Sequence, residues 1–195
     1  GRPINQSRGG PLSGFDVDQS PAYQHAYHLT TLGFTVFPLH FVTQTGACSC
    51  GSPSCTSNAG KHPMIKWSKI ASPELAIQEV HLAVGRHGWC NLGLITGRKR
   101  GPAPGIVAID LDVKEGKDGI TAFYKWCPEN GISQEELSTA WARTGSGGLH
   151  LVFLHPENDI KISTQANILI DGAGIDVRGD GGYIAVAPST HRSGR

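Results

Sequence analysis

The stretch that decides the fold is Gly105–Asp112, GIVAIDLD, in which an apolar, β-branched run ends in two aspartates. Such a run predicts a buried β-strand, and residues at i and i+2 of a strand project from the same face. The carboxylates of Asp110 and Asp112 would then lie side by side, with Cα atoms roughly 7 Å apart. Because two such charges repel without a cation or proton between them, the pattern predicts a metal site. The alternative is a strand end that frays into solvent, with Asp112 opening a turn.

Two later segments place further polar side chains among apolar strand residues. Residues 142–156, ARTGSGGLHLVFLHP, predict a strand, a glycine-rich turn and a second strand that carries His150. Residues 173–189, AGIDVRGDGGYIAVAPS, predict a strand with Asp176 and Arg178 on one face, a tight reversal at Gly179–Gly182 and another strand. Inward-pointing polar groups in three strands are costly unless they pair. A complex of metal and triphosphate would satisfy all of them together.

These segments resemble the three motifs of the archaeo-eukaryotic primase superfamily, in particular the bifunctional primase–polymerase domains of actinobacterial phages and plasmids. IDLD, RTGSGGLHLVF and GIDVRGDGGYIAVAPS follow the family's order and approximate spacing. The resemblance extends from about Ser20 to the last residue, and the glycine-rich third motif is its most specific part. It implies an α/β (α+β) fold. This would be an RRM-like catalytic core with a mixed sheet flanked by helices, an N-terminal α/β unit and a small zinc-binding loop.

The resemblance also assigns residues to nucleotidyl transfer. The catalytic ligands of Mg²⁺ or Mn²⁺ would be Asp110, Asp112 and Asp176. The contacts to the phosphates of the incoming nucleotide would be Ser146, Gly147, Gly148, His150 and Arg178. Three carboxylates on adjacent strands suit a pair of cations that neutralises the attacking and leaving oxygens of the reaction. Many relatives carry glutamate at the position of Asp112.

The activity implied by the resemblance is DNA primase and DNA polymerase activity in phage or plasmid replication, with a two-metal mechanism. A single-stranded DNA template and dNTP or NTP would be the substrates, and the bacterial cytoplasm the location. Two alternatives come from other classes. A metal-dependent replication-initiator nuclease would normally show two histidines one residue apart, which HLVFLH does not supply. A non-catalytic zinc module would bind DNA without binding nucleotides.

A second candidate metal site lies in residues 48–62, CSCGSPSCTSNAGKH. Three sulfur ligands and one nitrogen, from Cys48, Cys50, Cys55 and His62, fit a closed tetrahedral Zn²⁺ site. The surrounding loop, residues 46–63, is too polar to bury itself, so a metal would supply its missing core. With no open coordination position the zinc would be structural. The alternative is a flexible loop with reduced thiols.

Composition limits the remaining possibilities. The 195 residues suit one domain with a substantial core, predicted over residues 20–195, after a disordered segment at 1–19. The formal net charge of +1 gives no overall positive field, so a template would need a local groove. Five cysteines, three of them clustered, argue against a disulfide framework and for a reducing interior. No apolar run predicts a membrane span. The end of the chain directly after a predicted strand favours a longer protein, and the family resemblance implies a helicase module as the missing partner.

Capping signals predict the helices. Ser20–Pro21 begins a helix that runs to Gly33, and Ser72–Pro73 begins another through about Val84. Asp118 opens a third helix through Trp126, and Ser133 with Glu136 forms a capping box for a fourth. Residues 33–39 predict a strand, whereas residues 91–97 and 105–112 are apolar on both faces and predict central strands.

Other polar residues are weaker candidates. The basic run Arg98–Arg100 is a candidate for contacts with template phosphates, with a solvated loop as the alternative. Lys61 and Lys66, which flank the cysteine loop, are candidates for the same contacts. His191, shortly after the third motif, is a candidate for a nucleotide or template contact.

Overall fold

The computed structural model describes residues 14–157 and 160–194. Its strands form two sheets, a three-stranded one in the order β1-β2-β7 and a four-stranded one in the order β4-β5-β3-β6. In chain order the elements are η1 (Val17–Gln19), α1 (Pro21–Thr31), β1 (Val36–Leu39), η2 (Trp67–Lys69), α2 (Pro73–His87), β2 (Asn91–Ile95), β3 (Ile106–Leu111), α3 (Gly119–Glu129), β4 (Ala140–Arg143), β5 (Leu149–Leu154), β6 (Ile175–Arg178) and β7 (Tyr183–Val186).

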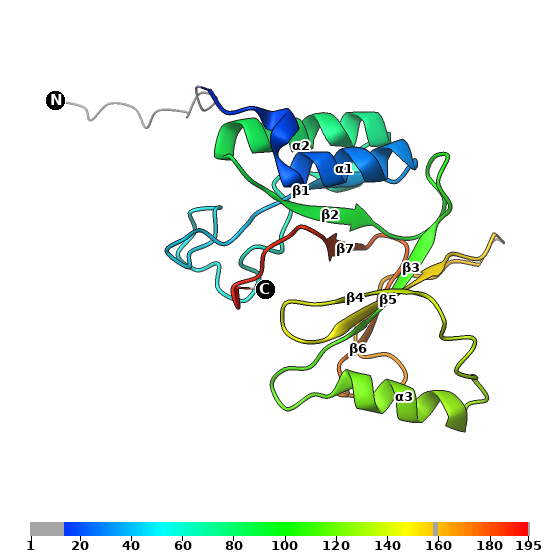
Figure 1. Ribbon diagram of the computed structural model, residues 1–195. Helices are drawn as coiled ribbons and strands as arrows, with labels where there is room; N and C mark the ends of the chain where they lie inside the picture. The colour runs from blue at the N-terminus through cyan, green and yellow to red at the C-terminus, as the bar shows by residue number, and fades with distance from the viewer. Residues whose placement is uncertain (1–13, 158–159, 195) are drawn as a thin grey trace.

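The first unit consists of α1, α2 and the three-stranded sheet. Both helices begin with proline in the first turn, and the Ser72 hydroxyl caps α2 by accepting from the Leu75 N–H. Gly88 ends α2 in the left-handed conformation, at φ 73°. The two helices lie together along one side of the sheet in Figure 1. Their small inner residues, including Ala22, Ala26 and Val80, pack with Leu92 of the central strand β2.

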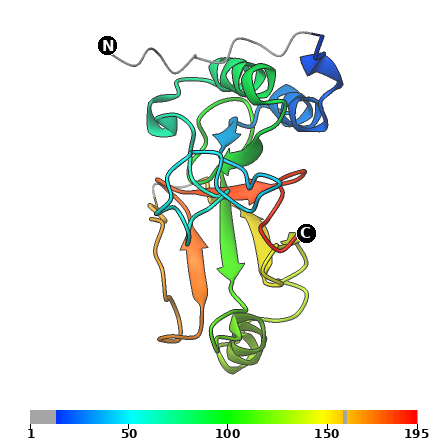
Figure 2. The ribbon, with the colours of Figure 1, turned by 90° about the vertical axis from the view of Figure 1, so that its left-hand side faces the viewer.

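The second unit consists of the four-stranded sheet and α3, which lies at the far end of the molecule from α1 and α2 (Figures 1 and 2). α3 packs on one face of the sheet through a core of Leu111, Phe123, Cys127, Leu151 and Ile175. Successive strand residues point to opposite faces. The residues next to these core positions, namely Asp110, His150 and Asp176, therefore project from the face opposite α3.

The central strands are confirmed, but the predicted mixed sheet is wrong because every strand pair in both sheets is antiparallel. The predicted hairpin across Gly179–Gly182 is also wrong, since β6 pairs with β3 and β7 pairs with β2. The glycine-rich turn carries the chain from one sheet to the other. It is held there by two bonds to the β2–β3 connection: the Thr96 hydroxyl donates to the Gly179 carbonyl at 2.8 Å, and the Arg98 N–H donates to Asp180 at 2.9 Å.

The predicted fourth helix is wrong as well. Both capping-box bonds form, from the Ser133 N–H to Glu136 Oε2 at 2.9 Å and from the Glu136 N–H to Ser133 Oγ at 3.3 Å. The chain makes only a turn, because β4 begins at Ala140 and pairs with β5. At the N-terminus, part of the predicted disordered segment is described. Its turn η1 packs Val17 against the first core, and residues 1–13 lie outside the described residues.

None of the described helices has the length and apolar character needed to cross a membrane.

The crossing between the sheets requires glycine at position 179, and we predict that Gly179→Ala is strongly destabilising. A Cβ atom there would overlap the carbonyl oxygen of Ile162 on the neighbouring backbone. We expect a loss of more than about 2 kcal/mol in the free energy of unfolding, measured by urea denaturation. Gly85→Ala in α2 is the matched control, since its Cβ would meet only Val17 at 3.4 Å. We expect that control to gain up to about 1 kcal/mol from helix propensity. Equal stability of the two variants would contradict the prediction.

Candidate active site and zinc loop

A row of polar side chains crosses the four-stranded sheet on the face opposite α3. In the register of the strands, Asp110 on β3 lies directly opposite both His150 on β5 and Asp176 on β6. His150 Nε2 is 3.4 Å from Asp110 Oδ1. The side chains are largely buried, with 12% of His150 and 14% of each aspartate exposed. The structure therefore brings together three residues that lie far apart in the sequence.

Arg178 joins the two carboxylates of this row. Its Nη2 atom lies 2.9 Å from Asp176 Oδ2 and 3.3 Å from Asp110 Oδ2. Burial by itself would raise the pKa of Asp110, but the hydrogen bond and charge of His150, followed by Arg178, outweigh it and lower that pKa. Asp110 therefore stays ionised at neutral pH, with basic groups on both sides.

Asp112 is the first residue after β3. Its N–H donates to the Gly174 carbonyl at 2.8 Å, and its side chain forms an ion pair with Lys114 Nζ at 3.1 Å. Across residues 14–157 and 160–194, only the cysteine loop has three or more such ligand atoms already gathered closely enough to hold an ion. To share a metal, the three carboxylates would move closer together and exchange part of their contacts with Lys114 and Arg178.

The predicted phosphate-binding turn between β4 and β5 lies at the same end of the sheet as Asp112. It is closed by bonds from the Thr144 N–H to the Gly148 carbonyl and from the Gly147 N–H to the Thr144 carbonyl, both 2.9 Å. Gly147 has φ 96°, which favours glycine, and a Cβ at Gly148 would overlap the Leu111 carbonyl oxygen. Ser146 Oγ lies 3.1 Å from the Thr144 hydroxyl. The glycines thus let the turn lie directly against the end of β3.

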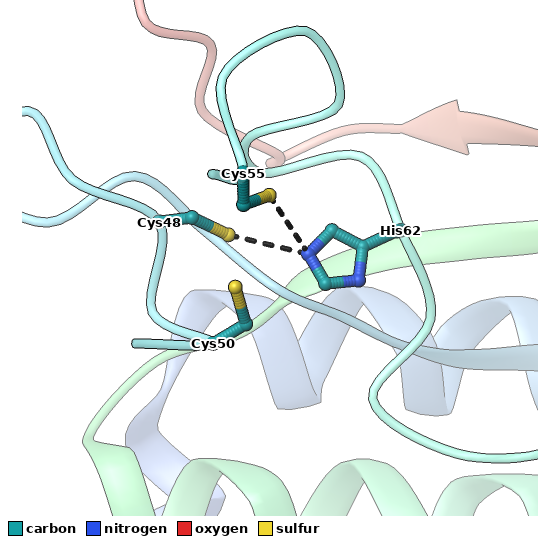
Figure 3. A group of neighbouring side chains, drawn as sticks. All are labelled: Cys48, Cys50, Cys55 and His62. Atoms are coloured by element: carbon teal, nitrogen blue, oxygen red, sulfur yellow. Dashed lines mark hydrogen bonds between the residues drawn. The ribbon is translucent and has the colours of Figure 1, made fainter. Parts of the chain in front are cut away.

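The cysteine loop connects β1 to η2, and its four candidate ligands point toward one another (Figure 3). Their ligand atoms all lie within 4.8 Å of one another. His62 Nε2 is 3.3 Å from Cys48 Sγ and 3.4 Å from Cys55 Sγ, and Cys50 completes the group. Three sulfurs and one imidazole nitrogen are a donor set that suits tetrahedral Zn²⁺. The loop can therefore hold a zinc ion, as its sequence predicts.

The pKa values of two thiols in this group are shifted in opposite directions. Burial acts to raise the pKa of Cys48, but backbone N–H groups of Cys50 and Gly60 and the His62 ring lower it to about 6. Desolvation and the neighbouring Cys48 and Cys50 raise the pKa of Cys55 to about 11. The two shifts favour a thiolate at Cys48 and a protonated thiol at Cys55. A metal that takes Cys55 as a ligand must therefore displace that proton.

Comparison with known families gives a match over most of the chain. The family model described as "Bifunctional DNA primase/polymerase, N-terminal" (Prim-Pol) matches residues 26–195, which is most of the chain. The chain belongs to the Prim-Pol family. No match to it is found among curated proteins.

The Prim-Pol fold also brings basic residues to the acidic row that the sequence did not connect with it. The ammonium group of Lys61, from the zinc loop, is close enough to Asp110 and Asp112 for their charges to act on it. Lys114 contacts Asp112 directly. Nothing in the sequence indicated this contact except that Lys114 follows Asp112 by two residues. His191 packs against Gly145 of the turn. Arg98, in contrast, lies at the other end of β3 and pairs with Asp180 at 3.4 Å.

We predict that the Prim-Pol domain binds one zinc ion per chain and releases at least one proton as it does so. The proton comes from Cys55, whose pKa of about 11 keeps it protonated at pH 7. Zinc affinity should therefore rise as pH increases from 6 to 8. Titration calorimetry in buffers of different ionisation enthalpy measures the protons released.

Cys55→Ser should abolish stoichiometric zinc, measured by atomic emission. Cys90→Ser, at a buried cysteine outside the loop, is the control and should keep it. Binding of zinc by Cys55→Ser with native affinity would rule out this ligand set.

Proposed function

We propose that this Prim-Pol domain catalyses template-directed nucleotidyl transfer with divalent metal ions, and that it both starts and extends DNA strands during phage or plasmid replication. Membership of the family implies DNA primase and polymerase function. The observation that best supports the proposal is the cross-strand row of Asp110, His150 and Asp176 on one face of the sheet. The row combines two carboxylates with His150, and Arg178 bridges the two carboxylates, so acidic groups for metal ions and basic groups for phosphates lie side by side.

Asp110, Asp112 and Asp176 would hold the catalytic Mg²⁺ or Mn²⁺. Their carboxylate oxygens are the hard ligands that these ions prefer, and largely buried carboxylates gain from a cation. When bound, the ions neutralise developing charge on the attacking and leaving oxygens. Zn²⁺ in the cysteine loop would instead be structural, because four protein ligands leave no position for a substrate.

His150 and Arg178 would orient the triphosphate of the incoming nucleotide. Both have N–H groups that form charge-assisted hydrogen bonds, and both are fixed by contacts with Asp110. The turn containing Ser146, Gly147 and Gly148 would approach the phosphates with its backbone. The proposed substrates are a single-stranded DNA template and dNTP or NTP. A C-terminal helicase module remains a prediction from the family resemblance.

We predict that Asp110→Ala lowers nucleotide incorporation by at least about a hundredfold, because it removes a ligand from the centre of the row. Primer extension with Mn²⁺ and labelled dNTP measures the effect. Asp171→Ala removes an exposed aspartate outside the row and is the matched control, expected to retain wild-type rates. Circular dichroism checks that both variants fold. Normal extension by folded Asp110→Ala would refute the proposed role of Asp110.

One incubation separates the proposed activity from its two alternatives. Labelled single-stranded DNA is mixed with the domain and Mg²⁺ or Mn²⁺, with and without nucleotides. A polymerase lengthens the strand only when nucleotides are present, whereas a replication-initiator nuclease shortens it without them. A non-catalytic zinc module leaves the strand unchanged, and calorimetry would then detect DNA binding but no dNTP binding. An unprimed template supplied with each nucleotide set further tests priming and sugar choice.

A further inference from the structure

Four basic residues from three separate segments gather beyond Asp112, at the end of the acidic row next to the phosphate-binding turn. They are Lys61 of the zinc loop, Lys114 of the β3–α3 connection, and His191 and Arg192 of the C-terminal segment. Lys114, Arg192 and the two aspartates all act electrostatically on Lys61, and Lys61, Arg192 and Lys114 all act on His191. We call these four residues the basic cluster.

The basic cluster is fixed by the fold rather than by chance proximity of surface side chains. The Tyr183 hydroxyl on β7 donates to the Lys61 carbonyl at 3.0 Å, and Arg192 Nη1 donates to the Thr56 carbonyl of the zinc loop at 3.2 Å. The Ser193 hydroxyl donates to the Gly145 carbonyl of the turn at 2.7 Å. The C-terminal segment therefore bonds both the zinc loop and the turn. Figure 1 shows the end of the chain beside that loop.

The charge of the cluster exceeds what its protein partners neutralise. Lys114 has Asp112 as an ion-pair partner at 3.1 Å, whereas the contact of Arg192 is with a neutral carbonyl. Like charges held together repel and disfavour the fold. The Nδ1 atom of His191 accepts from the Ser193 N–H at 3.2 Å, which leaves the ring proton on Nε2 as a donor. An anionic ligand would relieve the repulsion and use these donors.

The charge of the reactants indicates which anion fits. A nucleoside triphosphate carries roughly four negative charges, which two divalent ions would balance. The negative charges of the three carboxylates would then be opposed by the positive charge of Arg178. More cations are needed on the side of the site that Arg178 does not reach. The basic cluster lies there, beside the turn: Lys114 Nζ is 3.1 Å from Asp112, and Lys61 is close enough to Asp110 and Asp112 for their charges to act on it.

We infer that Lys61, Lys114, His191 and Arg192 form a polyphosphate subsite that binds the terminal phosphates of the incoming nucleotide. This inference rests on the proposed function and deepens it, because it adds phosphate contacts from outside the family motifs. Lys114 exchanges Asp112 for phosphate as the carboxylate takes up a metal ion. Lys61, interpreted from the sequence as a template contact, belongs instead to the nucleotide. The zinc loop thereby contributes a substrate contact, since Lys61 directly precedes the ligand His62.

The test compares Lys61→Gln and Lys114→Gln with Lys125→Gln, an exposed lysine of α3 on the far face of the sheet. Calorimetry with Mn²⁺ measures binding of inorganic tripolyphosphate, dNTP, dNMP and a single-stranded oligonucleotide. Each cluster variant should weaken tripolyphosphate and dNTP binding about tenfold, the effect of one charge-assisted hydrogen bond. Binding of dNMP and oligonucleotide should change less than about twofold, and Lys125→Gln should match wild type.

Each other outcome overturns the subsite. Weaker oligonucleotide binding with unchanged tripolyphosphate binding would assign the cluster to the nucleic-acid strand. No change with any ligand would show that the cluster binds none of them. Zinc content is measured in parallel, and Lys114→Gln gives an independent result if Lys61→Gln disturbs the zinc loop.

Failure of the proposed function gives a different pattern. If the wild-type domain binds tripolyphosphate through the cluster but incorporates no nucleotide on any template, the result supports the subsite and refutes the polymerase function. If both variants incorporate nucleotides at the wild-type rate and with an unchanged KM for dNTP, the result supports the polymerase function and excludes the subsite.

Discussion

The site depends on compensating the negative charge of largely buried carboxylates. Asp110 and Asp176 face each other across adjacent strands with 14% of each side chain exposed, and Arg178 lies between them. Removing carboxylates from water is costly unless each finds a cation or a hydrogen-bond donor. His150 on one side, Arg178 on the other and Lys114 at Asp112 meet that requirement. In the proposed function, the same basic groups would bind phosphate once metal ions occupy the carboxylates.

This arrangement needs two sheets rather than one. The four-stranded sheet carries the acidic row, and the three-stranded sheet anchors the zinc loop and the C-terminal segment against it. Asn91 on β2 illustrates the connection: its side-chain N–H donates to the Gly60 carbonyl of the zinc loop at 2.9 Å and to the Thr190 carbonyl at 2.8 Å. Asn91 is almost fully buried, so these bonds are strong constraints. Asn91 thus connects the zinc loop to the C-terminal segment, whose Ser193 hydroxyl in turn donates to Gly145 of the turn between β4 and β5.

Much of the fold could be predicted because its signals are local. Proline and serine mark where α1 and α2 begin, and GIVAIDLD marks a central strand that ends at charged residues. The failures share one cause, which is pairing between distant segments. Gly179–Gly182 has the composition of a hairpin turn, yet β6 and β7 find better partners in β3 and β2. Ser133 and Glu136 form their capping box, yet no helix extends from it because the residues that follow form β4 and pair with β5.

The sequence by itself determined which residue types the site contains, because carboxylates and a histidine among apolar strand residues are stable only with charged partners. It also determined the four candidate zinc ligands, since they lie within one short loop. Only the tertiary structure decided the register that aligns Asp110 with His150 and Asp176 and the approach of Lys61 and Arg192 to those acids. The physical reason is that these contacts join segments that are far apart in the chain. Their distances are set by how the two sheets pack, which no local pattern encodes.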